Sequence, residues 1–194
     1  MNAQDADSAQ LGRFFAEQGR RVLSFLGYSD SAYEDPAAML AHAAHTLDAF
    51  EPHGTLVNIG ATPDGIGAVY ELARRRGFVT TGIVSARARE AAMRLSPFVE
   101  HVFFVADASW GGLLPGSTQL SPTSQAIVEH SDVLVAIGGG PVARDELEAA
   151  LRAGKAARFI AAEMNHRIAL ETAARKGLPP PSDFRGAAAE RFGE

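Results

Sequence analysis

The sequence predicts an α/β protein with a doubly wound parallel sheet of about five strands and an N-terminal helical extension. From residue 55 onward, short continuous apolar runs alternate with glycine-rich turns and amphipathic segments, as in parallel sheets covered by helices. Two of the glycine-rich turns directly follow an apolar run. In the first fifty positions, by contrast, the apolar residues fall at helical spacing.

Five apolar runs are the predicted strands. They lie at residues 56–59, 78–84, 101–105, 132–137 and 157–160. Such units commonly form a Rossmann-like sheet of order 3-2-1-4-5 with right-handed crossovers. The first and fourth strands are then neighbours at the switch point, where ligands bind beyond the carboxyl ends of the strands.

The N-terminal segment predicts two helices that cover the sheet or contact a second subunit. The first helix has an apolar face and ends at Gly27. Its apolar residues are Leu11, Phe14, Phe15, Val22, Phe25 and Leu26. The second begins after Asp35, with Pro36 in its first turn. Because Phe14, Phe15 and Phe25 offer much aromatic surface, we expect a homodimer.

These patterns divide the chain into three parts. They predict a helical extension at 1–52, a Rossmann-like nucleotide-binding domain at 53–178 and a fraying C-terminal tail at 179–194. The tail contains three consecutive prolines, which disfavour regular structure.

Composition narrows the function. The 18 Lys and Arg residues against 23 Asp and Glu give a net charge of -5, which disfavours a nucleic-acid partner. The absence of cysteine excludes disulfides, thiolate nucleophiles and Cys-ligated zinc. Without a secretory leader or a membrane-length apolar run, we expect a cytoplasmic protein that does not enter membranes.

We expect no metal site. His42 and His45 share one helix face, and Glu163 and His166 have similar spacing, but neither pair has an evident third ligand.

The two glycine-rich loops predict a phosphate site. Glycines let backbone N–H groups approach an anion, and each loop leads into a helix N-terminus. The predicted binding residues are Gly60, Thr62, Gly65 and Gly67 in the first loop, and Gly138, Gly139 and Gly140 in the second. The alternative is that these glycines only form tight turns.

Residues 131–140, followed by Asp145, Glu146 and the stretch 153–155, resemble the Lonely Guy and lysine-decarboxylase-like proteins of the SLOG superfamily. The resemblance implies a Rossmann-like fold, a nucleotide or phosphoribosyl ligand, and a homodimer. For the hydrolases of that group it implies cleavage of a nucleoside monophosphate, with Glu146 as the catalytic acid. We expect Asp145 or Glu146 to accept hydrogen bonds from ribose hydroxyls.

This sequence departs from the hydrolase pattern. The segment 121–130 lacks the Arg-Lys pair that those enzymes carry there, so charge stabilisation of the departing ribose phosphate is missing. The departure favours a binding or sensing protein over an enzyme.

Residues 60–67 also resemble the glycine-rich turn of short-chain dehydrogenases. Ser85 and Arg87 follow the second predicted strand, where such enzymes contact the 2′-phosphate of NADP. No Tyr-x-x-x-Lys pair is present, which disfavours a dehydrogenase. An NADP-binding, oxidoreductase-like protein is kept as an alternative.

The long segment 106–121 contains the single tryptophan, Trp110. Its indole either stacks on an aromatic ligand or anchors the loop by burial. Taken together, the sequence predicts binding of a phosphorylated, nucleotide-like molecule, with no required cofactor. A nucleoside-monophosphate hydrolase is the first alternative.

Overall fold

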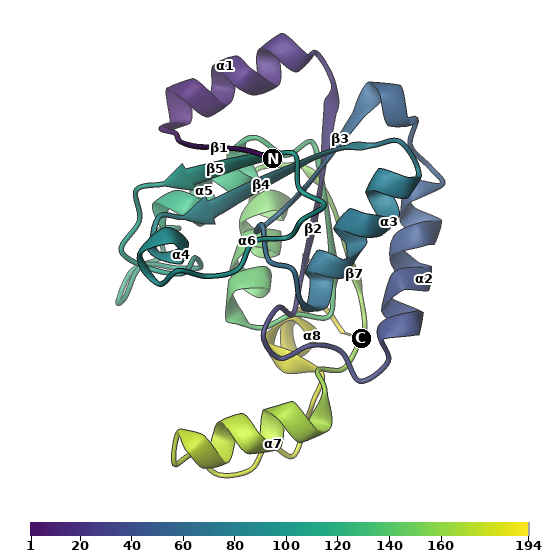
Figure 1. Cartoon of the computed structure of the whole chain (residues 1–194). Coiled ribbons are helices and arrows are strands. Elements are labelled where there is room, and N and C mark those ends of the chain that lie inside the picture. Colours follow the sequence, from purple (N-terminus) through teal and green to yellow (C-terminus); the bar gives the residue numbers. More distant parts are fainter. Residues whose placement is uncertain (194) are drawn as a thin grey trace.

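The computed structural model describes residues 1–193, which form one seven-stranded sheet with helices on both faces (Figure 1). All neighbouring strands are parallel. In spatial order the strands are β1 (Asn2–Asp5), β5 (His101–Val105), β4 (Val79–Ser85), β3 (Thr55–Ile59), β2 (Arg21–Gly27), β6 (Val133–Ile137) and β7 (Ala156–Ile160).

Eight α-helices connect or follow these strands. They are α1 (Ser8–Gln18), α2 (Pro36–Leu47), α3 (Val69–Arg75), α4 (Arg87–Glu90), α5 (Pro122–Glu129), α6 (Pro141–Arg152), α7 (His166–Arg175) and α8 (Gly186–Phe192). Two short 3₁₀ turns are η1 (Pro52–Gly54) and η2 (Gly65–Ala68). None of the helices in residues 1–193 is both long and apolar enough to cross a membrane.

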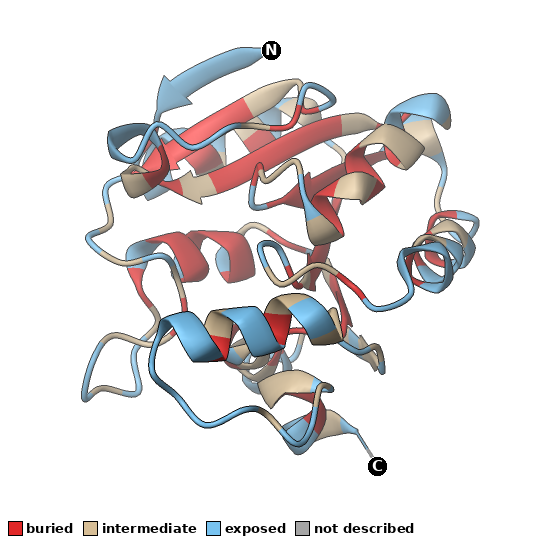
Figure 2. Ribbon diagram, turned by 60° about the horizontal axis from the view of Figure 1, so that its bottom comes forward, coloured by how far each residue is buried: buried red, intermediate tan, exposed pale blue. Residues whose placement is uncertain are grey.

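The sheet separates two apolar cores. One lies between the sheet and α2 with α3, and includes Phe25, Met39 and Tyr70. The other lies under α1, α5 and α6, and includes Leu11 and Leu134. Figure 2 shows the central strands buried from both sides and the N-terminal strand exposed at the edge. Burial on both faces explains why the central strands are continuous apolar runs.

The first fifty residues differ from the prediction. The expected single helix over residues 11–26 is wrong, because α1 ends at Gly19, whose φ of +59° gives a left-handed cap. Residues 22–26 then form the buried part of β2, the strand between β3 and β6. A short apolar run fits both a helix face and a buried strand, so spacing alone misassigned it. Residues 1–52 are therefore not a helical extension, since they supply β1 and β2.

The five predicted strands are confirmed as β3, β4, β5, β6 and β7, but the sheet has seven strands rather than five. β1 was missed because its four residues are exposed and carry no apolar pattern. The two strands that precede the glycine loops, β3 and β6, were predicted to be neighbours. This prediction is wrong, because β2 lies between them.

The predicted helix after Asp35 is confirmed as α2, whose Ala38 N–H donates to the Asp35 carboxylate at 2.8 Å. The aromatic side chains expected at a subunit interface pack within the chain instead. Phe15 and Phe25 are buried, and Phe14 packs against Phe103 with ring centroids 4.7 Å apart. The homodimer stays a prediction, without the aromatic surface that motivated it.

The C-terminal tail was expected to fray, and this is wrong for its last part. Residues 186–192 form α8, and its Ala188 and Ala189 are buried. Small side chains let the helix pack closely against α6 despite the prolines before it.

A directed row of buried hydrogen bonds crosses the middle of the sheet. The Thr81 hydroxyl donates to Asn58 Oδ1 at 3.2 Å, and Asn58 Nδ2 donates to Ser24 Oγ at 3.0 Å. Ser24 Oγ lies 2.6 Å from Ser131 Oγ, which itself donates to the Ile127 carbonyl at 2.5 Å. Because the Ser131 hydroxyl hydrogen is used in the bond to Ile127, the Ser24 hydroxyl donates to Ser131 Oγ. The row ties β4, β3 and β2 to α5.

We expect Thr81→Val to destabilise the fold. The substitution conserves shape but leaves the buried Asn58 Oδ1 without its donor, which costs about 1–3 kcal/mol. Urea unfolding followed by circular dichroism measures this difference. The matched control, Thr118→Val at an exposed position, should change stability by less than about 0.5 kcal/mol. Equal effects of the two variants would contradict a structural role for the row.

Candidate functional site

A cavity of about 540 Å³ opens at the carboxyl ends of β2, β3 and β4. Its far side is formed by the first turns of α5 and α6. Apolar side chains from the strands and from α5 form much of its wall. They include Phe25, Ile59, Ile83 and Ile127. Asn58, in the middle of the hydrogen-bonded row, also lines the cavity.

The loop after β3 is held in a fixed shape on one side of the cavity. The Tyr70 hydroxyl donates to the Thr81 carbonyl at 2.8 Å and accepts the Ala61 N–H at 3.2 Å. Burial raises the pKa of Tyr70, so its hydroxyl stays protonated. Gly65 has a φ of +59°, and a Cβ there would lie 2.2 Å from the Tyr28 carbonyl oxygen. Glycine is thus required at Gly65 by close packing.

The N-terminus of α6 faces the cavity through Val142 and Ala143. The helix begins after Gly140, which has no side chain to cap it, and Pro141 occupies the first turn. The first-turn N–H groups therefore lack a capping side chain, and the helix dipole adds partial positive charge there. This end of the cavity favours an anion.

Glu146 lies one turn further along α6 and lines the same cavity. Its side chain is buried, and its Oε1 accepts a hydrogen bond from Ser124 Oγ at 2.5 Å. Burial raises the pKa of Glu146 to about 7, against the opposing effect of the Ser124 bond; the charge of Asp145 adds to the rise. Near neutral pH the carboxyl is therefore protonated in part of the molecules.

Thr123, at the start of α5, also lines the cavity. It is 3% exposed, and its hydroxyl oxygen is itself buried. Its backbone N–H donates to Asp107 Oδ2 at 2.9 Å. Partial burial would raise the pKa of Asp107, but this bond, those from Ser109 and a contact with the Thr123 hydroxyl hold it below its usual value. The Thr123 hydroxyl thus faces the Asp107 carboxylate and is not an open position for a ligand.

The structure brings together only some of the residues that the sequence singled out. Four of them line the cavity, namely Gly60, Thr62, Ser85 and Glu146. The others do not line it, namely Gly65, Gly67, Arg87, Asp145 and the three glycines Gly138, Gly139 and Gly140. Their predicted binding roles stay predictions.

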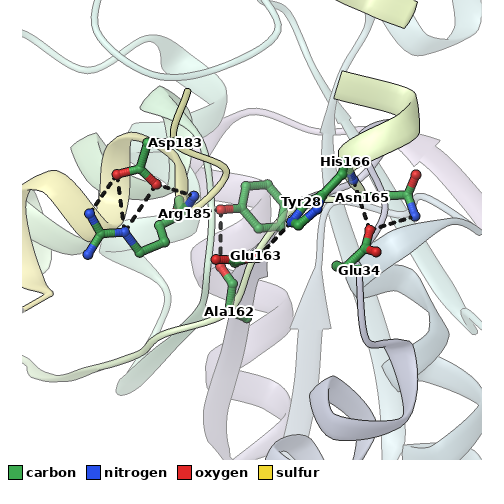
Figure 3. Close-up of polar contacts among 8 residues, drawn as sticks. All are labelled: Tyr28, Glu34, Ala162, Glu163, Asn165, His166, Asp183 and Arg185. Atoms are coloured by element: carbon green, nitrogen blue, oxygen red, sulfur yellow. Dashed lines mark hydrogen bonds and ion pairs between the residues drawn. The ribbon is translucent and has the colours of Figure 1, made fainter. Parts of the chain in front are cut away.

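The second glycine loop is covered by Tyr28 and the C-terminal segment. A Cβ on Gly138 would lie 2.5 Å from the Tyr28 ring, and the Ala188 N–H donates to the Gly139 carbonyl at 3.1 Å. The Tyr28 hydroxyl contacts the Ala162 and Arg185 carbonyls at 3.3 and 2.6 Å (Figure 3). Close packing explains Gly138 and Gly139, whereas a Cβ on Gly140 would meet no atom within 4 Å.

Asp145 is engaged in packing the long loop. Its Oδ1 accepts two bonds from Arg144, at 3.0 and 2.8 Å, and its Oδ2 accepts the Leu113 N–H at 3.1 Å. Arg144 is thus turned toward Asp145. A ribose hydroxyl at Asp145 would have to share these oxygens.

Neither candidate metal pair gains a third ligand among the residues that the structure describes. Glu163 Oε2 lies 2.7 Å from His166 Nε2, beside the contacts of Asn165 and Glu34 shown in Figure 3. Residues 1–193 contain no group of three or more side chains placed to hold a metal ion.

Sequence reasoning missed Thr123 and Asn58 as cavity residues, although it did predict a ligand site at the helix start that follows the second glycine loop. The stretch Ser121-Pro122 did signal a helix start, and Ser121 Oγ does accept the Ser124 N–H. No pattern, however, placed that helix beside the cavity, because the position of β2 was unknown.

The fold and cavity define a Rossmann-like α/β protein with a small-molecule-sized pocket at its strand ends. No protein-family model and no curated protein matches this chain. Solved structures do share its fold. TM1055, a structural-genomics target, is 22% identical, with a TM-score of 0.50 over 71% of this chain and 72% of that one.

Two further structures are named for the molybdenum cofactor. The Moco carrier protein from Chlamydomonas reinhardtii is 18% identical, with a TM-score of 0.52 over 88% of this chain and 94% of that one. The molybdenum cofactor binding protein from Rippkaea orientalis is 18% identical, with a TM-score of 0.52 over 72% and 76%. These likenesses confirm the Rossmann-like fold that the sequence resemblance implied; at such identities they carry the fold alone.

We expect Glu146→Gln to stabilise the protein above pH 7 and to change little near pH 4. The folded pKa of about 7 exceeds the ordinary 4.5, so the natural protein loses stability as the pH rises between these values. The full difference is on the order of 3 kcal/mol. Urea unfolding at several pH values measures it, with Glu190→Gln at an exposed position as the control. A pH-independent effect of Glu146→Gln would contradict the raised pKa.

Proposed function

We propose that this chain binds a small phosphorylated, nucleotide-like molecule in the cavity, with the phosphate at the N-terminus of α6. The observation that carries the proposal is the N-terminus of α6, which has no capping side chain and faces the cavity through Val142 and Ala143. Free N–H groups at a helix N-terminus suit phosphate oxygens.

The charge of Glu146 bears on the same end of the cavity. When ionised, this carboxylate repels a phosphate; when protonated, it becomes a further donor. With its pKa at about 7, we expect binding to strengthen as the pH falls from 8 to 6.

The rest of the cavity suits an organic ring or chain. Its apolar walls and its volume of about 540 Å³ lie in the range of small-molecule pockets. Two proteins of the same fold are named for carrying or binding the molybdenum cofactor, so this fold accommodates a binding role. Such a protein would act in the cytoplasm as a homodimer and need no resident cofactor.

A nucleoside-monophosphate hydrolase is the second candidate, because Glu146 lines the cavity and holds a proton near neutral pH. The basic side chains near the cavity favour a hydrolase less, because both are paired with carboxylates. Arg94 lines the cavity but pairs with Asp64 at 3.3 Å, and Arg144 pairs with Asp145. An assay for free base released from AMP, GMP, CMP or UMP tests this candidate. Turnover near one per second that collapses in Glu146→Gln would establish an enzyme.

NADP binding is the third candidate. Ser85 lines the cavity, but its hydroxyl donates to the Asp107 carbonyl at 2.9 Å and accepts the Arg87 N–H at 3.2 Å. Tighter binding of NADP than of NAD would favour it over the mononucleotide proposal.

The proposal predicts that Val142→Asp, at the N-terminus of α6, weakens nucleotide binding and leaves stability nearly unchanged. A carboxylate in the cavity wall repels the phosphate, which should cost about tenfold in affinity, while an acidic residue in the first turn of a helix is well tolerated at this 36% exposed position. Thermal unfolding and calorimetric titration with AMP, GMP, CMP, UMP and NADP measure both quantities. Thr118→Val is the control and should change neither. If no compound of this panel binds the natural chain, the proposed function is wrong.

A further inference from the structure

Trp110 lies at the mouth of the cavity with its indole half exposed. It lines the cavity and is 50% exposed, although it is the single tryptophan of the chain. Met93 and Val142 line the same mouth and are 46% and 36% exposed. Three large apolar side chains thus surround the entrance without covering one another from solvent. Such a surface is suited to an apolar, flat part of a ligand.

Arg87 holds the indole from one side. Its guanidinium carbon lies 5.0 Å from the centre of the Trp110 ring, and its Nη1 donates to the Ala108 carbonyl at 3.1 Å. The cation–π contact and the backbone bond fix the loop and the ring together. The guanidinium covers only part of the ring, since half of the residue stays exposed.

The loop that carries Trp110 is bound to the same two helix ends that form the proposed phosphate site. The Gly112 N–H donates to Ser124 Oγ at 2.7 Å, and Ser124 donates in turn to Glu146. The Leu113 N–H donates to Asp145 Oδ2 at 3.1 Å. These bonds set the distance and direction from Trp110 to the start of α6.

We infer that Trp110 stacks on the planar ring of the bound molecule and so selects phosphorylated ligands that carry an aromatic ring. The inference rests on the proposed function, because it takes the phosphate at α6 as the other end of the ligand. Arg87 is then a positioning residue that orients the indole. Stacking of a base on an aromatic side chain tolerates every base, so it selects the presence of a ring over its identity.

The test compares AMP with ribose 5-phosphate, which has the same phosphate and sugar but no ring. Calorimetry measures both affinities, and tryptophan fluorescence reports on position 110 alone. We expect AMP to bind at least tenfold more tightly than ribose 5-phosphate and to quench the fluorescence. Trp110→Ala should lose about tenfold in AMP affinity and leave ribose 5-phosphate within twofold.

Two further variants separate stacking from folding. Trp110→Phe should keep most of the AMP affinity, and Leu170→Ala, at another exposed apolar residue, should bind as the natural chain does. Arg87→Gln should weaken AMP, NAD and NADP alike. A loss confined to NADP would make Arg87 a ligand of the 2′-phosphate and overturn its positioning role.

The outcomes distinguish this inference from the proposed function. If AMP binds but Trp110→Ala leaves its affinity unchanged, or if ribose 5-phosphate binds equally well, stacking is overturned and phosphate binding stands. If neither compound binds, nor any other mononucleotide, both are overturned.

Discussion

The fold depends on a row of buried hydrogen bonds that runs in one direction from Thr81 through Asn58 and Ser24 to Ser131. Each donor in this row has one acceptor, and the row ends on the backbone carbonyl of Ile127. In a low-dielectric interior, a shift of one strand would leave several of these groups unpaired at once. The row therefore fixes β2 in register between its neighbours and holds the start of the α5–β6 connection against it. Asn58 belongs to this row and also lines the cavity, so the row forms part of the cavity wall.

The sequence pattern predicted the second half of the chain well and the first quarter poorly. Residues 101–105 are β5 as predicted. An unbroken apolar run of this length is typical of a strand that is buried on both faces. The run at 22–26 is equally apolar, yet its spacing also fits the face of a helix that continues α1. Gly19 was the better stop signal, because a left-handed residue ends α1 there. Strand β1 carries no apolar pattern at all, since it pairs along one edge and faces solvent.

The same misassignment changed the expected site. Glu146, Gly60 and Thr62 do meet at one cavity, but the second glycine loop does not line it and packs under Tyr28 and α8. Glycine patterns indicate where backbone must come close to something, and they do not distinguish a ligand from a neighbouring side chain. Thr123 shows the opposite difficulty. A threonine in a first helical turn is common, and only the three-dimensional structure reveals that this one lies at the cavity.

The contact between Tyr28 and Arg185 joins residues 157 positions apart. During synthesis the N-terminal end of a chain emerges first. The carbonyl of Arg185, with which Tyr28 pairs, is therefore made long after Tyr28 itself. The contacts of the loop after β2 are thus completed late, although β2 is among the first segments made. A ribosome-bound nascent chain that lacks α8 would hold most of the sheet but leave the Gly138–Gly140 loop uncovered. The covering of this loop therefore depends on α8 and the segment before it.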